Sequence, residues 1–311
     1  MNNILEIKSL NISEKKGTIK YARPSIQITN DGIKADAHAG KWHRQISLLG
    51  IDSIEKFEKE LGRKIKYGEF AENITTEGLP VYKTHPLDRF VSGEIELEVT
   101  QIGKKCHGTN CMIYRETGNC VMPKEGIFCR VIKGGEMKTG DKLEYYPKVF
   151  KIKVITLSDR AYNGIYSDKS GPKITEISRK WFEGKELKSE FKNLIVPDEP
   201  AELVNAMLDG FNDECDIIFT TGSTGIGVRD IAIETIKPML DKEIPGIMEL
   251  IRVKYGMEKP NALLSRGIAG VKNRTLVFAM PGSPKAIAEY LEEINKVLWH
   301  SFLMLHGIDS H

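Results

Sequence analysis

The sequence predicts a two-domain protein, in which a β-rich barrel or sandwich precedes an open, mostly parallel α/β sheet flanked by helices. Its 311 residues suit two domains of roughly 100–200 residues each. In the first half, short apolar stretches are separated by glycines, which is typical of all-β domains. In the second half, strand and helix patterns alternate, as in α/β proteins. We place the boundary near residues 147–150 and expect domains at 1–147 and 148–311.

The first half contains strand patterns and a single helix pattern. The stretch 95–99 alternates apolar and charged residues, as a half-buried strand does. The pattern over 51–61 predicts a helix that ends at Gly62. The expected strands of this half are 26–28, 46–49, 95–99, 128–132 and 142–146.

In the second half, the stretch 216–221 is apolar with almost no alternation, which predicts a strand buried on both faces of a parallel sheet. Pro238 should shorten or kink the helix expected around it. The expected strands are 152–157, 191–196, 216–221 and 275–279. The expected helices are 174–182, 201–211, 231–240 and 286–305.

Composition narrows the function classes. Hydrophobic residues make up 41% and charged residues 28%, which suits a chain with a buried core. A net charge of +2 without blocks of like charge does not favour nucleic acid as the main partner. No apolar run reaches the roughly 18–20 residues of a membrane helix. Charges interrupt the first apolar residues, so we expect no secretory signal and a cytoplasmic protein.

Four expected strands of the second half end in loops with polar or glycine-rich sequences. Ligands of open α/β sheets bind at the carboxyl ends of the strands. The loop 220–230 contains three glycines, one serine and three threonines before a helix, which favours an anion or nucleotide pocket. An ordinary glycine-rich connector is the alternative.

The loop 281–285 has Ser283 as a natural N-cap and Pro284 at the first helical position, which alone indicates a well-capped helix. Lys285 in the first helical turn opposes the helix dipole, so a nearby anion would explain it better.

Asp198 and Asp230 each follow a strand and precede a helix. Either could be a helix N-cap. As a pair at one edge of the sheet they could hold Mg²⁺, which favours oxygen ligands and offsets phosphate charge in phosphoryl and nucleotidyl transfer.

Together these motifs resemble the Mog-type molybdopterin adenylyltransferases over roughly residues 151–306. The resemblance implies a molybdopterin-binding α/β fold, often trimeric, that converts ATP and molybdopterin into adenylylated molybdopterin and pyrophosphate with Mg²⁺. It assigns Asp198 and Asp230 as the catalytic, metal-binding aspartates. One departure is Ser223, because the family usually has two adjacent glycines at positions 222–223. The motifs, in chain order, are 158–160, 168–172, 197–199, 221–230, 264–266 and 281–286. The implied cofactor-binding residues are Ser158, Asp159, Thr221, Gly222, Ser223, Thr224, Gly225, Ser265, Gly282, Ser283, Pro284 and Lys285.

Four of the five cysteines fall between residues 106 and 129. Their spacing lacks the paired Cys-x-x-Cys of zinc ribbons, so structural zinc is the less favoured alternative. Cys106 is flanked by Lys104, Lys105 and His107, and nearby positive charge favours the thiolate needed for sulfur transfer. The remaining three, Cys111, Cys120 and Cys129, are interpreted as packing residues.

The first half resembles the MOSC domain, named for the C-terminal part of molybdenum cofactor sulfurases, over roughly residues 4–146. The motifs are 36–40, 43–49, 68–74, 103–107, 126–128, 134–135 and 140–141. The resemblance implies a β-barrel that handles the molybdenum cofactor or carries sulfur on Cys106. His38 and Arg44 match its polar cluster, although His38 could instead be a turn histidine bonded to backbone.

The two resemblances together predict a bifunctional protein of molybdenum cofactor maturation. The C-terminal half would adenylylate molybdopterin, and the N-terminal half would bind the cofactor or deliver sulfur. Expected partners are a molybdate-insertion protein, a sulfur donor or a molybdoenzyme, and the chain is expected to form a homo-oligomer, with a trimer as one possibility. The alternatives are a non-catalytic carrier of the cofactor and a related pocket for another pterin or nucleotide.

Overall fold

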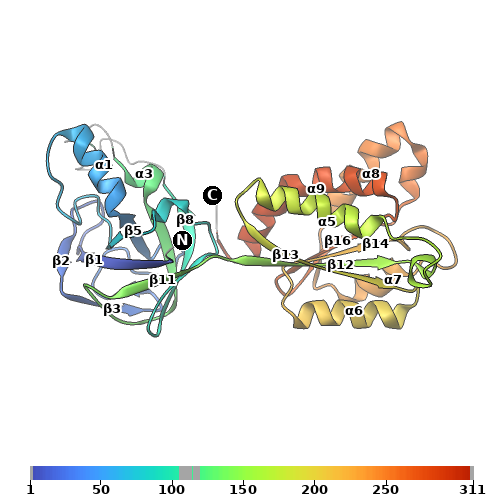
Figure 1. Cartoon of the computed structure of the whole chain (residues 1–311), viewed down its shortest axis with the longest axis horizontal. Helices are drawn as coiled ribbons and strands as arrows, with labels where there is room; N and C mark the ends of the chain where they lie inside the picture. Colours follow the sequence, from blue (N-terminus) through green and yellow to red (C-terminus); the bar gives the residue numbers. More distant parts are fainter. Residues whose placement is uncertain (1–2, 105–113, 115–119, 309–311) are drawn as a thin grey trace. The chain divides into compact units, whose positions relative to one another are not determined.

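A computed structural model describes residues 3–104, 114 and 120–308 (Figure 1). Residue contacts divide the chain into two compact units, whose sequences meet between Lys148 and Val149.

The N-terminal unit is a closed barrel rather than a sandwich. Seven strands form a ring in which each is hydrogen-bonded to two neighbours, so the ring has no free edge. All pairings in the ring are antiparallel except that between β5 and β6. Around the ring the strands are β1 (Ile4–Ile12), β11 (Lys142–Tyr146), β7 (Arg89–Ser92), β8 (Ile95–Ile102), β9 (Ile127–Lys133), β5 (Ile46–Gly50) and β6 (Ile74–Glu77).

Smaller elements surround the barrel. Helix α1 (Ile51–Leu61) ends at Gly62, which has the left-handed φ of 72° expected at a helix end, so the predicted helix is confirmed. The second strand, β2 (Tyr21–Arg23), pairs with β1, and a separate sheet has the order β10 (Gly135–Lys138), β3 (Ser25–Thr29), β4 (Gly32–Ile33). Short helices are α3 (Met122–Glu125) and the 3₁₀ turn η1 (Val81–Lys83).

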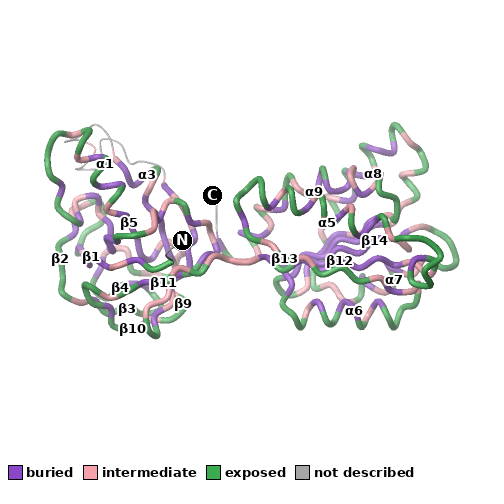
Figure 2. Tube along the Cα trace, in the orientation of Figure 1, coloured by how far each residue is buried: buried purple, intermediate pink, exposed green. Residues whose placement is uncertain are grey.

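The C-terminal unit is an open six-stranded sheet, as the alternating pattern predicted. Its strand order is β13 (Lys188–Val196), β12 (Val149–Leu157), β14 (Ile217–Thr221), β17 (Thr275–Met280), β16 (Ala269–Lys272), β15 (Lys242–Glu243). The first four strands are parallel, whereas β16 and β15 add an antiparallel edge that the sequence pattern does not predict. Every residue of β14 is buried, which explains its unbroken apolar pattern (Figure 2).

Helices cover both faces of this sheet. Helices α5 (Ser170–Glu183) and α9 (Pro284–Leu305) lie on one face, and α6 (Pro200–Asn212) lies on the other (Figure 1). The helix predicted over 231–240 is shorter: α7 (Ala232–Ile236) gives way to the 3₁₀ turn η3 (Lys237–Met239), which contains Pro238. The remaining helices are α4 (Asp159–Tyr162), α8 (Pro245–Glu258) and the 3₁₀ turn η4 (Pro260–Leu264).

The parallel arrangement positions the predicted site. The carboxyl ends of β12, β13, β14 and β17 lie at one edge of the sheet, and each of the four predicted loops starts there. Among the described residues, no helix combines the length and apolar character needed to cross a bilayer.

Candidate functional site at the strand ends

The loops after β12 and β13 are tied together by two aspartates. The Asp159 backbone N–H donates to Asp198 Oδ2 at 3.2 Å, and the Asp198 N–H donates to Asp159 Oδ1 at 3.0 Å. The guanidinium of Arg229 pairs with Oδ2 of Asp159, which connects the loop after β14 to the same group. Three of the predicted loops therefore meet at the Asp159 and Asp198 carboxylates.

Gly222 sits where three strand ends pack backbone against backbone. Its φ is +97°, and a Cβ there would lie 2.4 Å from the carbonyl oxygen of Leu157, so a side chain cannot be accommodated. Its N–H donates to the Met280 carbonyl at 3.0 Å, and Thr221 Oγ1 donates to the Pro281 carbonyl at 2.8 Å. The glycine-rich turn is thus held against the loop after β17.

Ser223 closes the glycine-rich loop with its side chain. The hydroxyl accepts a hydrogen bond from Ile231 N at 2.9 Å and donates to the Arg229 carbonyl at 3.0 Å. Its φ of +56° shows that the serine keeps the left-handed backbone that a glycine adopts freely. The departure from two adjacent glycines therefore leaves the turn conformation in place and adds a brace across the loop.

Within the described residues, the loop between these braced ends has backbone donors without an acceptor. In the hydrogen bonds formed by the described residues, the backbone N–H groups of 223–226 donate to no acceptor. Successive free N–H groups in a turn form a concave anion-binding surface. This is the arrangement that a phosphate-binding turn requires.

The second predicted aspartate faces the inside of this loop. Gly227 N–H donates to Asp230 Oδ2 at 2.6 Å, and a Cβ on Gly225 would lie 2.7 Å from the same oxygen. Neither aspartate caps the helix that follows it: α6 begins after Glu199 and α7 after Ile231, and both lack a side-chain cap. The N-cap interpretation of Asp198 and Asp230 is therefore wrong.

The charge of Asp230 acts on the Asp198 carboxylate. Partial burial raises the pKa of Asp198, the Ser223 hydroxyl counters this, and the charge of Asp230 raises it further. Because that hydroxyl has one proton, it can donate to Arg229 or to Asp198 but not to both. A divalent cation would relieve the repulsion between the two acids.

Two carboxylates are a donor set that Mg²⁺ can accept. Among the described residues, no three His, Cys, Asp or Glu side chains are grouped as a metal site. Mg²⁺ typically binds one or two carboxylates and completes its shell with water and substrate phosphates. Asp198 and Asp230 therefore suit a cation that arrives with a phosphate-bearing substrate.

The remaining predicted residues of this half line or support the same edge. Ser158 caps α4 and bonds Tyr166 Oη at 2.9 Å. Ser283 caps α9, with Pro284 as its first residue and Lys285 in its first turn. Ser265 Oγ accepts a hydrogen bond from Tyr290 Oη on α9 at 2.9 Å.

Sequence reasoning missed two supporting residues. Arg266 donates from its backbone to the Thr224 carbonyl at 3.0 Å and from Nε to the Gly225 carbonyl at 2.7 Å, while its guanidinium pairs with Glu234. Asp168 accepts from Thr156 Oγ1 and from Ser170 N, each at 2.8 Å. Both residues lie in motifs of the family resemblance, but their contacts depend on the fold.

In the N-terminal unit, His38 is held by side chains. Its Nδ1 lies 3.2 Å from Lys20 Nζ and 3.3 Å from Asp36 Oδ1, and Lys20 and Asp36 form an ion pair whose side chains are fully buried. The His38 ring also stacks on Trp42, and Arg44 Cζ lies 5.0 Å from the centroid of the Trp42 ring. These are side-chain contacts, unlike those of a turn histidine bonded only to backbone.

The predicted sulfur carrier, Cys106, lies outside the described residues, as do Lys105, His107 and Cys111. Of the cysteines that are described, Cys129 is buried in the barrel core and Cys120 is half-buried, and neither forms a disulfide. Burial raises the pKa of the Cys129 thiol well above its usual range, which suits a packing residue.

Comparison with known proteins matches each half to a family model. Residues 35–144 match the MOSC domain, and residues 153–300 match the "probable molybdopterin binding domain". The molybdopterin adenylyltransferase of Helicobacter pylori is 40% identical over 145 residues, which cover 46% of this chain and 80% of that protein.

Two further relatives extend this likeness. The molybdopterin adenylyltransferase of Pyrococcus furiosus is 40% identical over 159 residues, or 50% of this chain and 90% of that protein. A molybdenum cofactor biosynthesis bifunctional protein of Chlorobaculum tepidum is 35% identical over 179 residues, or 56% and 54% of the two chains. These matches agree with the loops found at the strand ends. The chain therefore belongs to the molybdopterin adenylyltransferase family through its C-terminal half and carries a MOSC domain in its N-terminal half.

Proposed function

We propose that the C-terminal unit transfers AMP from ATP to molybdopterin in molybdenum cofactor biosynthesis. In this reaction a phosphate oxygen of molybdopterin attacks the α-phosphorus of ATP, the bond from that phosphorus to the bridging oxygen breaks, and pyrophosphate leaves. Support comes from the relatives named above and from one structural observation: two aspartates and a turn with free N–H groups converge at one sheet edge.

The residues of this edge have separable roles in the proposal. The free N–H groups of 223–226 bind phosphate oxygens, helped by the absence of a side chain at Gly222. Lys285, in the first turn of α9, supplies a positive charge for a phosphate. Asp198 and Asp230 hold Mg²⁺, which when bound offsets negative charge on the phosphates. Arg229 and Ser223 keep the loops of both aspartates together.

For the N-terminal unit we propose that it binds the cofactor or carries sulfur on Cys106. His38 and Arg44 are the proposed cofactor contacts, because both lie against the ring of the partly exposed Trp42. A whole protein that only carries the cofactor is the competing function.

The experiment is a turnover assay of the full chain with Asp198→Asn and Asp230→Asn. Removing one charge from the pair should slow molybdopterin-dependent ATP consumption at least about 100-fold, because electrostatic stabilisation of the phosphates is lost. Binding of molybdopterin should persist, since the turns around Gly222 and Gly282 are unchanged. Asp209→Asn, at an exposed position on α6, is the matched control and should retain full activity.

Two results would contradict the proposal. Near-normal turnover of Asp230→Asn would remove that residue from the catalytic machinery. Molybdopterin binding by the wild-type chain without any ATP consumption would favour the carrier function.

A further inference from the structure

Four side chains of the N-terminal unit form what we call the Trp42 cluster: Lys16, His38, Trp42 and Arg44. Trp42 Nε1 donates to the His38 carbonyl at 2.8 Å, which fixes the indole. The His38 ring lies nearly parallel to it, with an interplanar angle of 12° and centroids 6.5 Å apart. The loop after β4 and the segment before β2 contribute these residues.

Two cations share the indole. Lys16 Nζ lies 5.3 Å and Arg44 Cζ 5.0 Å from the centroid of the Trp42 ring. The attraction of each cation to the ring is modest, and the two positive charges repel each other. Negative charge brought to this grouping would reduce the repulsion and stabilise it.

No carboxylate of the described residues supplies that charge. Neither Lys16 nor Arg44 takes part in an ion pair there, and Arg44 Nε is buried without a hydrogen-bond partner. Buried polar groups in native proteins are nearly always satisfied, so an unmade bond at a buried guanidinium nitrogen points to a missing acceptor.

The acid that contacts His38, Asp36, already has other partners. Asp36 is buried, pairs with Lys20 through Oδ2 and accepts from the backbone of Ser13 at 3.0 Å and of His38 at 2.9 Å. His38 Nδ1 lies 3.2 Å from Lys20 Nζ and 3.3 Å from Asp36 Oδ1, so Nε2 is the ring nitrogen that these two groups leave available, and it can donate to a ligand when it carries a proton. The cluster thus offers donors and positive charge but no acceptor of its own.

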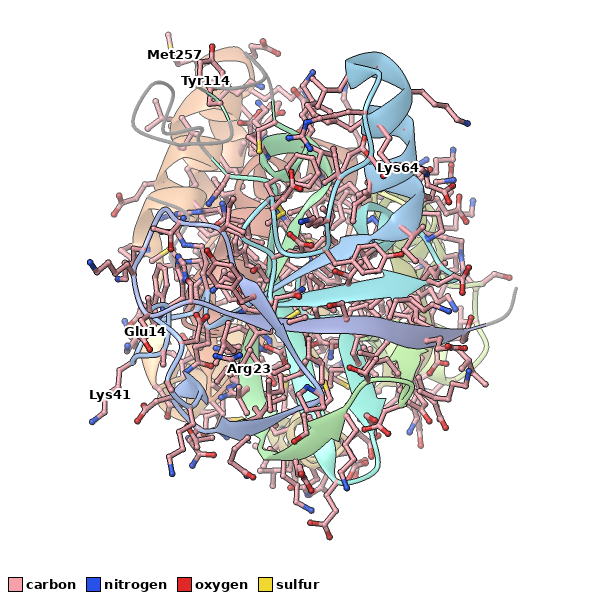
Figure 3. All side chains as sticks on the ribbon, turned by 90° about the vertical axis from the view of Figure 1, so that its left-hand side faces the viewer. Glu14, Arg23, Lys41, Lys64, Tyr114 and Met257 are labelled. Carbon is pink, nitrogen blue, oxygen red and sulfur yellow. The ribbon has the colours of Figure 1, made fainter. Side chains whose placement is uncertain are left out.

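The cluster can be reached from solvent. Lys16 is exposed, and the side chains of His38, Trp42 and Arg44 are partly exposed. Glu14 and Lys41, close to the cluster in sequence, lie at the surface of this unit (Figure 3). Glu14 forms no ion pair with Lys16 among the described contacts, so it leaves the ammonium available to a ligand.

We propose that the Trp42 cluster binds a doubly charged tetrahedral oxyanion of the phosphate type. The planar Arg44 guanidinium can hold two oxygens at once, and Lys16 and His38 Nε2 can donate to the others. The inference deepens the proposed role of the N-terminal unit, and the physiological source of the anion rests on that role. That source is either the phosphate ester of molybdopterin or free molybdate.

Trp42 itself reports on binding. The chain has three tryptophans, and Trp181→Phe with Trp299→Phe leaves Trp42 as the sole emitter in the full-length protein. Titration with inorganic phosphate, at ionic strength held constant with sodium chloride, should change its emission saturably. Arg44→Gln should weaken binding at least about tenfold, because a charge-assisted bidentate contact is lost. The phosphate affinity of Arg44→Lys should lie between those of the parent and Arg44→Gln, since lysine keeps the positive charge but cannot hold two oxygens as a guanidinium does.

Arg23→Gln is the matched control, because Arg23 is an exposed arginine of the same unit (Figure 3) and no described ion pair includes it. It should bind phosphate as the parent does. The absence of a saturable response in the parent, or equal weakening by Arg23→Gln and Arg44→Gln, would overturn the inference. If Arg44→Gln does not fold, Lys16→Gln takes its place, and parent-like affinity of that variant would be equally damaging.

Two ligands distinguish the source of the anion. Tighter binding of phenyl phosphate than of molybdate identifies a phosphate ester, and the reverse order identifies free molybdate. These titrations contain neither ATP nor molybdopterin, so their failure would leave the proposed adenylyl transfer untouched. Conversely, normal turnover of Asp230→Asn would not affect the anion site.

Discussion

Glu72 provides a stability test that does not depend on function. Its side chain is completely buried in the N-terminal unit. Oε1 accepts from Gly68 N and from Thr75 Oγ1 at 3.1 Å, whereas Oε2 has no partner among the described residues. Burial raises the pKa of Glu72 to about 7, although these hydrogen bonds act in the opposite direction. The charged form of Glu72 is therefore poorly tolerated in the fold.

The sign and size of the effect follow from proton binding. Between pH 4.5 and about 7 the folded protein holds a proton on Glu72 that the unfolded chain has lost, so the free energy of unfolding falls as pH rises through this window. A pKa moved from 4.5 to about 7 corresponds to roughly 3 kcal/mol. Well above pH 7, Glu72 is deprotonated in both the folded and the unfolded protein, so the loss of unfolding free energy no longer changes with pH.

Glu72→Gln removes this penalty while keeping the shape and the accepting oxygen. At pH 8 the variant should unfold at a temperature higher by about 6–12 °C, since roughly 3 kcal/mol is divided by the unfolding entropy of a unit of this size. The two proteins should converge near pH 4.5. Thermal unfolding followed by Trp42 emission, with Trp181 and Trp299 replaced by Phe, reports on the N-terminal unit.

Two comparisons make the result decisive. Glu60→Gln, an exposed carboxylate at the end of α1, should show no such pH-dependent gain. Burial also acts to raise the pKa of Asp36, but hydrogen bonds from His38 and Lys20 outweigh it and hold this pKa well below its usual range. The stability from Asp36 is lost only in stronger acid, so it is constant across the window. The reasoning would be refuted if the difference in unfolding temperature between the parent and Glu72→Gln did not change with pH, or if it increased as the pH is lowered.

Three further predictions concern separate parts of the chain. A fragment starting near residue 148 should fold alone and retain adenylyl transfer, and an aggregated or inactive fragment beside an active full chain would contradict this. Brief alkylation followed by residue-resolved mass spectrometry should find Cys106 labelled fastest at neutral pH. Faster labelling of Cys111, Cys120 or Cys129 would contradict the assignment of Cys106 as the reactive thiol. Ser223→Ala should lower turnover about tenfold because the loop brace is lost, and Ser223→Gly should lower it less because glycine relieves the positive φ; equal effects would exclude that account.

Local pattern was sufficient for the main elements of the fold. The alternation of 95–99 and the unbroken apolar run of β14 predicted strands correctly, because each pattern reports directly which faces are buried. The strand β16, Ala269–Lys272, was missed because four residues containing Ala and Gly carry little strand signal. It forms by pairing with β17, and that contact is set by the fold rather than by its own composition.

The candidate site likewise has features that local sequence patterns predict and features that depend on the complete fold. The placement of Gly222, Asp198 and Asp230 at one edge of the sheet could be predicted, because strand ends of a parallel sheet must meet there. Ion pairs between residues distant in sequence could not be predicted. Arg266 reaches Glu234, and Lys20 reaches Asp36, through contacts that depend on the complete fold. Their residue types carried no signal, since charged side chains are usually solvated.

Ser223 shows how a departure from a motif can preserve its chemistry. Holding a non-glycine residue at a φ of +56° costs about 1–2 kcal/mol. The two hydrogen bonds of its hydroxyl contribute about 0.5–1.5 kcal/mol each, which is enough to offset that cost. The brace uses the Ser223 side chain and carbonyl but not its N–H. The serine therefore stiffens the turn without using the N–H groups of 223–226. Those donors remain available to a phosphate, as they would with glycine at position 223.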